Sequence, residues 1–185
     1  MRPITPSTAA RAGLSRTGLY RAAESGAMTR IARGIYLPED APVADWGMTE
    51  AATRRPESTI CLTSALAYHD LTDAIPDTLN IAIPRGTRSP TTEQAITWHQ
   101  FDAETFDLGR EEIPIEGTDL RIGLYSPERC IADAFRLRGQ LGYETARDAL
   151  KEWLLRGGKP NTLMQLALQL PRAKTPLLQA LELLT

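Results

Sequence analysis

Long hydrophobic runs are missing from this sequence. No stretch approaches the roughly 18 consecutive apolar residues that a membrane-spanning helix requires, and the first residues lack the charged-then-apolar pattern of a secretory signal. Cysteine is scarce as well, because Cys61 and Cys130 are the only two and lie far apart, each within an apolar helical pattern. Their spacing fits neither a metal knuckle nor a disulfide scaffold. We therefore expect a cytoplasmic protein with two buried thiols.

Motifs for catalysis and cofactor binding are also lacking. The sequence has no glycine-rich phosphate loop after a strand, no Gly-x-Ser-x-Gly turn and no Cys–His pairing for nucleophilic chemistry. We expect no enzyme activity, no cofactor and no bound metal. The composition is that of an ordinary globular protein, since 42% of the 185 residues are hydrophobic and 24% are charged. A disordered or fibrous chain is thereby excluded.

Negative charge is nearly absent from the first 36 residues. Glu24 is the one acidic residue there against six arginines, which gives this segment a net charge of +5 and leaves −7 for the rest of a chain whose total is −2. If the protein binds nucleic acid, we expect this basic segment to contact it. The six are Arg2, Arg11, Arg16, Arg21, Arg30 and Arg33.

The basic segment also has the pattern of two short helices followed by a hairpin. Caps, a proline at a first helical position and turn glycines occur at the spacing that such a unit requires. Helix, turn, helix and hairpin within about forty residues is typical of a winged helix-turn-helix. The expected elements are a helix over residues 5–12, a turn at Gly13, a helix capped by Ser15, and strands over residues 28–32 and 34–37.

Beyond residue 38 the pattern predicts an α+β domain with a small, largely antiparallel sheet and a helical bundle. Residues 39–55 indicate a linker with a short helix around Trp46, and residues 56–185 the domain itself. Residues 60–69 are apolar nearly all round, which predicts a buried helix, and Ser126 favours the start of another. The remaining expected elements are strands over residues 78–83, 95–101, 112–115 and 120–125, and helices over residues 143–156, 162–170 and 175–184.

Three segments, in matching order over nearly the whole chain, resemble AbiEi-type antitoxins of abortive-infection toxin–antitoxin systems. Residues 13–26 and 31–36 resemble the family's winged helix, residues 60–71 its apolar Ala-Leu helix, and residues 126–133 its Ser-Pro-Glu-Arg helix start. The resemblance implies a phage-defence regulator that represses its own promoter through residues 1–38 and counteracts a nucleotidyltransferase-like toxin. Related winged helices have one more helix before residue 5, so we expect this domain to lack its first helix.

The candidate DNA contacts follow from how a winged helix docks. The start of the second helix enters the major groove, where arginine pairs with guanine and hydroxyls reach phosphates. The hairpin turn can contact backbone phosphate or a narrow minor groove. Winged helices often bind paired half-sites, so a monomer and a homodimer both stay open. The predicted contacts are Ser15, Arg16, Thr17, Tyr20 and Arg21 on the helix and Arg30, Arg33 and Gly34 at the hairpin.

One cluster could be interpreted as a metal or acid–base site. His69, Asp70, Asp73 and Asp77 are suitable ligand types, and a nucleic-acid-acting enzyme built on them is an alternative function. Their spacing matches no known metal motif. We therefore interpret His69 as the end of a buried helix and the aspartates as turn and cap residues.

Two further polar residues are candidate site residues, Asp133 and His99. Asp133 is four residues after Arg129 and three before Arg136, which favours an ion-pair role within one helix. His99 lies in a strand pattern without an obvious partner.

The main alternative to a DNA-binding repressor is an antitoxin that acts by protein contact alone through its acidic C-terminal domain.

Overall fold

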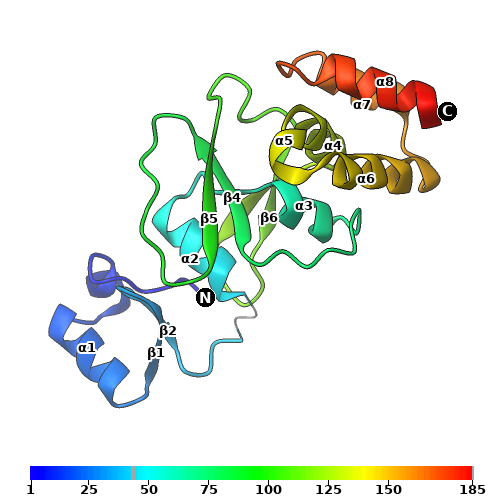
Figure 1. Cartoon of the computed structure of the whole chain (residues 1–185). Coiled ribbons are helices and arrows are strands. Elements are labelled where there is room, and N and C mark those ends of the chain that lie inside the picture. Colours follow the sequence, from blue (N-terminus) through cyan, green and yellow to red (C-terminus); the bar gives the residue numbers. More distant parts are fainter. Residues whose placement is uncertain (43–44, 185) are drawn as a thin grey trace.

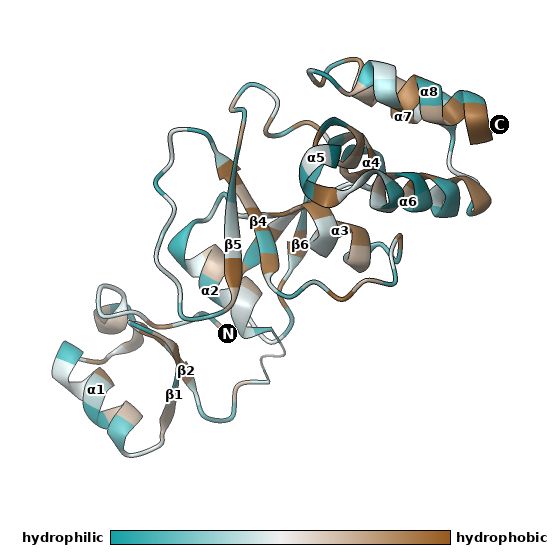
Figure 2. Ribbon diagram, in the orientation of Figure 1, coloured by the Kyte–Doolittle hydropathy of each residue, from teal (hydrophilic) through white to brown (hydrophobic). Residues whose placement is uncertain are grey.

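The computed structural model describes residues 1–42 and 45–184. The small N-terminal unit lies at one end, a five-stranded sheet in the middle and the C-terminal helices at the other end (Figure 1). In Figure 2, hydrophobic residues gather along the central strands and the last helices, whereas the helix α1 (Arg16–Glu24) carries several hydrophilic ones. The fold class is α+β, as the sequence predicts.

The N-terminal unit contains the predicted elements in the predicted order, with a shorter first helix. Hydroxyls explain the shortening, because Thr5 Oγ1 lies 2.8 Å from Ser7 Oγ and 3.0 Å from Thr8 Oγ1. Such local side-chain bonds compete with regular helix formation. Gly13, at φ +72°, then ends the segment. The elements are the 3-10 helix η1 (Ala9–Ala12), α1 (Arg16–Glu24), β1 (Met28–Ala32) and β2 (Ile35–Pro38).

The hairpin of β1 and β2 is buried on both faces. Alternation along the strands places Met28 and Tyr36 in a small core with Leu19 of α1, whereas Ile35 and Leu37 lie in a second cluster on the opposite face. Ile4 extends this sheet, because it exchanges backbone hydrogen bonds of 2.8 and 2.9 Å with Tyr36. The hairpin is therefore a layer between α1 and the rest of the chain.

The central sheet is mixed, so the expectation of a largely antiparallel sheet is wrong. Its order is β5-β4-β3-β7-β6, in which β3–β4 and β6–β7 pair antiparallel while β4–β5 and β3–β7 pair parallel. The central strand β3 has only two residues, both fully buried, and the sequence places Ile60 in a helix instead. The strands are β3 (Thr59–Ile60), β4 (Leu79–Pro84), β5 (Ile96–Phe101), β6 (Arg110–Pro114) and β7 (Arg121–Tyr125).

Helices surround this sheet and build one large core with it. Ser126 caps α4 as predicted, since its Oγ accepts the Arg129 backbone N–H at 3.3 Å. Ala51 and Ala52 of α2, within the expected linker, belong to the same core. Among the described residues no helix is long and apolar enough to cross a membrane. The helices are α2 (Trp46–Arg54), α3 (Leu62–Tyr68), α4 (Pro127–Arg136), α5 (Arg138–Leu141), α6 (Tyr143–Leu155), α7 (Pro160–Ala167) and α8 (Lys174–Leu184).

Candidate nucleic-acid interface

The outer side of α1 carries all five residues that the sequence predicts for the second helix. Leu19 is the one fully buried side chain of α1, and it fixes which side of the helix faces solvent. Ser15 caps the helix, because its Oγ accepts the Gly18 N–H at 2.9 Å. The backbone N–H groups of Arg16 and Thr17 have no acceptor within the helix, as in any first turn. The residues on this exposed surface are Ser15, Arg16, Thr17, Tyr20 and Arg21.

Arg16 and Tyr20 form a pair that the sequence analysis did not predict. The Arg16 Nε donates to the Tyr20 hydroxyl at 3.2 Å, one helical turn away, and the guanidinium carbon lies 5.9 Å from the tyrosine ring centre. Tyr20 in turn packs edge-on against Tyr36 of the hairpin, with ring centres 6.3 Å apart. The hydrogen bond to Tyr20 raises the pKa of Arg16. Arg16 is thus an oriented cation on the exposed surface.

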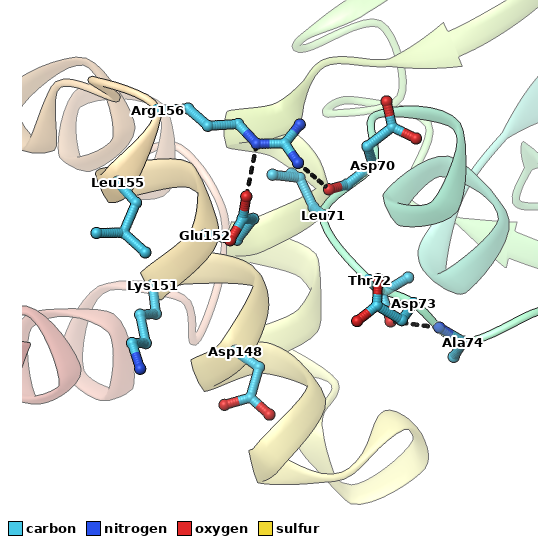
Figure 3. Close-up of a pocket in the computed structure, with 10 residues that line it drawn as sticks. All are labelled: Asp70, Leu71, Thr72, Asp73, Ala74, Asp148, Lys151, Glu152, Leu155 and Arg156. Atoms are coloured by element: carbon cyan, nitrogen blue, oxygen red, sulfur yellow. Dashed lines mark hydrogen bonds and ion pairs between the residues drawn. The ribbon is translucent and has the colours of Figure 1, made fainter.

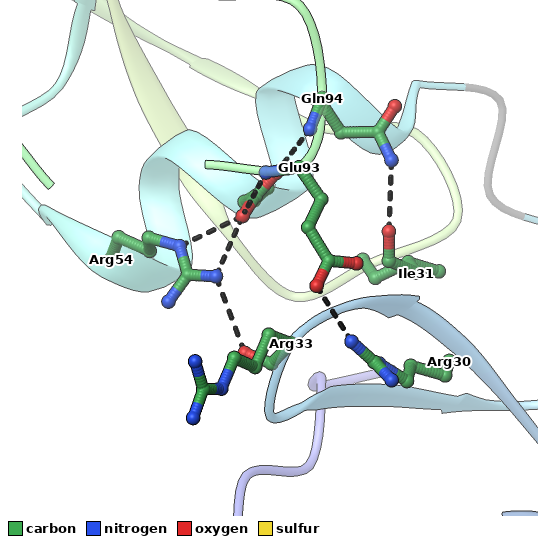
Figure 4. A network of polar contacts seen from close by, with 7 residues as sticks. Arg30, Ile31, Arg33, Arg54, Glu93 and Gln94 are labelled. Atoms are coloured by element: carbon green, nitrogen blue, oxygen red, sulfur yellow. Dashed lines mark hydrogen bonds and ion pairs between the residues drawn. The ribbon is translucent and has the colours of Figure 1, made fainter. Parts of the chain in front are cut away.

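The hairpin residues are placed differently from one another. Arg30 donates to the Glu93 carboxylate at 2.6 Å, and both side chains are about half exposed. The Arg33 carbonyl accepts from Arg54 at 3.2 Å, while its guanidinium points away from Arg54 into solvent (Figure 4). Gly34 has φ +75°, a conformation that favours glycine. Within the part of the chain that the structure describes, Arg33 therefore presents a cation without an ion-pair partner at the turn, whereas Arg30 is held by an acidic partner.

A buried carboxylate joins the hairpin to the rest of the protein, and its partners Arg54, Glu93 and Gln94 are labelled in Figure 4. Glu50 of α2 is fully buried and accepts from Arg54 at 2.7 and 2.8 Å and from the backbone N–H groups of Glu93 and Gln94 at 3.1 and 2.9 Å. The Gln94 side chain then donates to the Ile31 carbonyl at 2.8 Å. Sequence reasoning missed this network, since Glu50 lies 43 and 44 residues before the Glu93 and Gln94 N–H groups that it accepts from, and only a Glu on an apolar helix face hints at it.

The residues at 69–77 do not converge on a metal site. His69 caps the end of α3, as predicted, and its Nε2 lies 2.8 Å from the Tyr125 carbonyl oxygen. Asp70 and Asp73 line an open cavity of about 650 Å³ against α6, and their carboxylates point in different directions (Figure 3). Arg156 bonds the Asp70 carbonyl there at 2.7 Å. Within residues 1–42 and 45–184, no group of three or more His, Cys, Asp or Glu side chains could hold a metal ion.

Two other interpretations of polar residues can be checked in the structure. Asp133 accepts from Arg129 at 2.9 Å and from Arg136 at 2.6 Å, which confirms the predicted ion pairs. His99 has a partner that the sequence did not reveal, because its Nε2 lies 2.8 Å from Asn80 Oδ1. Burial lowers the pKa of His99.

The two cysteine predictions are confirmed. Cys61 and Cys130 are free and buried. Burial raises the pKa of both thiols well above their usual value. The nearby Asp133 carboxylate adds to the shift in each case, so both sulfurs are held as neutral thiols.

Comparisons with known proteins bear on the N-terminal unit and on the fold. Residues 1–38 match the family model described as "Transcriptional regulator, AbiEi antitoxin". The match supports an AbiEi-type regulator family for the unit that carries the exposed surface of α1. The crystal structure of the Rv2827c protein from Mycobacterium tuberculosis is similar in fold, with a TM-score of 0.63 and 16% identity over 98% of this chain and 72% of that one. A comparison with curated protein sequences gives no significant match.

Proposed function

We propose that this protein is a DNA-binding repressor of its own promoter and that residues 1–38 are a winged helix-turn-helix. The observation that carries the proposal is the solvent-facing side of α1, where a capped helix follows a tight turn and exposes Ser15, Arg16, Thr17, Tyr20 and Arg21 together. This surface lies within the segment that matches the transcriptional-regulator family.

In the proposed complex the first turn of α1 enters the major groove. Arg16 reads guanine O6 and N7, since its guanidinium is long enough to reach a base edge and is oriented by Tyr20. The free N–H groups of the first turn and the Ser15 and Thr17 hydroxyls contact phosphate. The Ser15 oxygen already accepts the cap hydrogen bond, so it contributes its own O–H as donor.

The hairpin contributes affinity without sequence preference. Arg33 contacts backbone phosphate, because its side chain is exposed and extends from the turn. Arg30 stays with Glu93 and sets the orientation of the hairpin on the second unit, so we assign it an indirect part in binding. Gly34 allows the turn that places Arg33.

Repression of a reporter tests this proposal. The DNA upstream of the gene is placed before a reporter, and the wild type is compared with the double variant Arg16→Ala/Arg21→Ala and with Arg147→Ala as a matched control. Arg147 is also exposed but lies on α6 beside Asp148. The double variant is expected to lose repression while the control keeps it. Equal repression by all three would contradict the assignment of α1.

We further propose that the protein is the antitoxin of an AbiE-like pair and opposes a nucleotidyltransferase-type toxin encoded beside it. The support is the family description that residues 1–38 match, together with the resemblance of residues 60–71 and 126–133 to the same family. Co-expression of the neighbouring gene tests this proposal. Growth rescued by wild type and by Arg16→Ala/Arg21→Ala would assign protection to residues outside α1, whereas no rescue by either would refute the antitoxin role.

A further inference from the structure

An arginine-lined cavity lies at the far end of the protein from α1. The cavity has a volume of about 600 Å³ and is lined by residues from the end of α4, the start of α5, the turn after α7 and the first half of α8. Figure 1 shows these elements at the end of the molecule opposite α1. Three of its side chains are arginines, and no acidic residue lines it. The lining residues are Arg136, Arg138, Gly139, Arg172, Thr175, Pro176 and Gln179.

A second cavity of about 440 Å³ adjoins the first and shares Arg136 and Arg172 with it. Arg85 adds another positive charge, which Asp102 partly balances at 3.8 Å. Its other walls combine polar side chains with ring-bearing and apolar ones, namely Gln100 and Gln140 with Trp98, His99, Phe101, Leu137 and Pro171. The two cavities together offer an arginine-lined end and an end of mixed polar and ring-bearing character.

The positive charge of the first cavity is not neutralised from within the protein. Arg136 shares the single carboxylate of Asp133 with the buried Arg129, so two cations face one anion. Arg138 donates to the Phe135 carbonyl at 3.1 Å. Among the residues that the structure describes, neither Arg138 nor Arg172 forms an ion pair. This surplus stands out because the chain after residue 36 carries a net charge of −7.

The Arg136 side chain and the backbone at Arg172 are held in defined conformations. The Arg136 side chain is only 8% exposed, bonds Asp133 at 2.6 Å and lies 5.4 Å from the centre of the Phe101 ring. Arg172 has φ +65°, a left-handed conformation that is uncommon for any residue other than glycine. Its neighbour Ala173 is fully buried and holds the turn in place. Backbone outliers of this kind cluster at ligand sites.

From these observations we propose that the cavity binds a small phosphate-bearing ligand of nucleotide size. The phosphate lies among Arg136, Arg138 and Arg172, whose planar guanidinium groups match phosphate oxygens in geometry and charge. The sugar and base extend along His99 and Leu137 into the adjoining cavity. Both cavities have the volume of small-molecule sites, which span about 300–1,000 Å³. A DNA duplex cannot reach the recessed Arg136.

Calorimetric titration of the full chain tests the site with ATP, adenosine, inorganic phosphate and a promoter duplex as probes. The wild type is compared with Arg138→Gln/Arg172→Gln, and Arg147→Gln serves as control. Both replaced side chains of the double variant are exposed, so its melting temperature should stay that of the wild type. We expect ATP to bind one-to-one, adenosine not to bind, and the double variant to lose at least about tenfold in ATP affinity. The control should stay within about twofold.

Several results would overturn the proposal. ATP affinity that is unchanged in the double variant, or absent in the wild type, removes the site. Inorganic phosphate that binds as tightly as ATP contradicts a ligand of nucleotide size. Promoter affinity that falls by the same factor as ATP affinity shows that the arginines serve the nucleic-acid backbone instead. Because the double variant leaves α1 intact, a failure here is distinguishable from a failure of the proposed repressor function.

Discussion

Replacing Glu50 with alanine removes the hydrogen-bond acceptor that joins α2 to Glu93 and Gln94, the residues beside the hairpin. The buried carboxylate accepts from the Arg54 guanidinium and from two backbone N–H groups, all at 3.1 Å or less. Breaking a buried pair by removing one partner costs about 3–5 kcal/mol. Because the Arg54 side chain is 23% exposed and can turn to water, we take the lower end, about 3 kcal/mol. At about 2–4 °C per kcal/mol, Tm should fall by about 6–12 °C.

Thermal unfolding followed by circular dichroism measures this change. Glu112→Ala is the matched control, since Glu112 is 51% exposed and pairs with two arginines at 3.4 and 3.6 Å. An exposed pair contributes about 0.5 kcal/mol, so losing both should cost about 1 kcal/mol and lower the Tm of the control by no more than about 4 °C. The Glu50→Ala variant should also exchange the Glu93 and Gln94 amide hydrogens faster. A Tm for Glu50→Ala no lower than that of the control would refute this account of the network.

Three further predictions concern binding and titration. Arg16→Ala should reduce the preference for promoter over scrambled DNA about tenfold, whereas Arg33→Ala should weaken both alike; equal retention of preference in an anisotropy titration would refute that division. Native protein at about pH 8 should resist iodoacetamide at Cys61 and Cys130, because burial raises both thiol pKa values, and mass spectrometry after unfolding should show both modified. Burial lowers the pKa of His99, so wild type should lose stability as the pH falls below about 6.5 while His99→Gln loses less; parallel curves would contradict this.

Local signals predicted most of the elements. Ser15 and Ser126 both cap helices where the sequence places helix starts, because a hydroxyl before an apolar-periodic run satisfies free N–H groups. The predicted pairing of Asp133 with Arg129 and Arg136 needs only helical spacing. Helix caps and ion pairs within one helix, which depend on residues three or four positions apart, could therefore be predicted from the sequence.

Long-range pairing could not be predicted in the same way. The two residues of β3 are too few to show alternation, and complete burial makes them look like the start of the following helix. No signal in the sequence therefore indicated that β3 pairs parallel with β7, and likewise none that β4 pairs parallel with β5. Arg30 was predicted as a DNA contact from its position at a turn, and its partner Glu93 lies 63 residues away. The candidate site was thus predicted in composition but not in its internal contacts.

The most direct test of the central claim is a fluorescence-anisotropy titration of the protein with its own promoter and with a scrambled duplex at about 50 and 200 mM salt. Tighter binding to the promoter is predicted. We expect the exposed Arg21 of α1 to contact phosphate as Arg33 does, and these two cations give a slope of log affinity against log salt near −2 per bound chain, or about a tenfold loss between the two conditions. Absence of binding to either duplex, or equal and salt-independent binding to both, would contradict the repressor function.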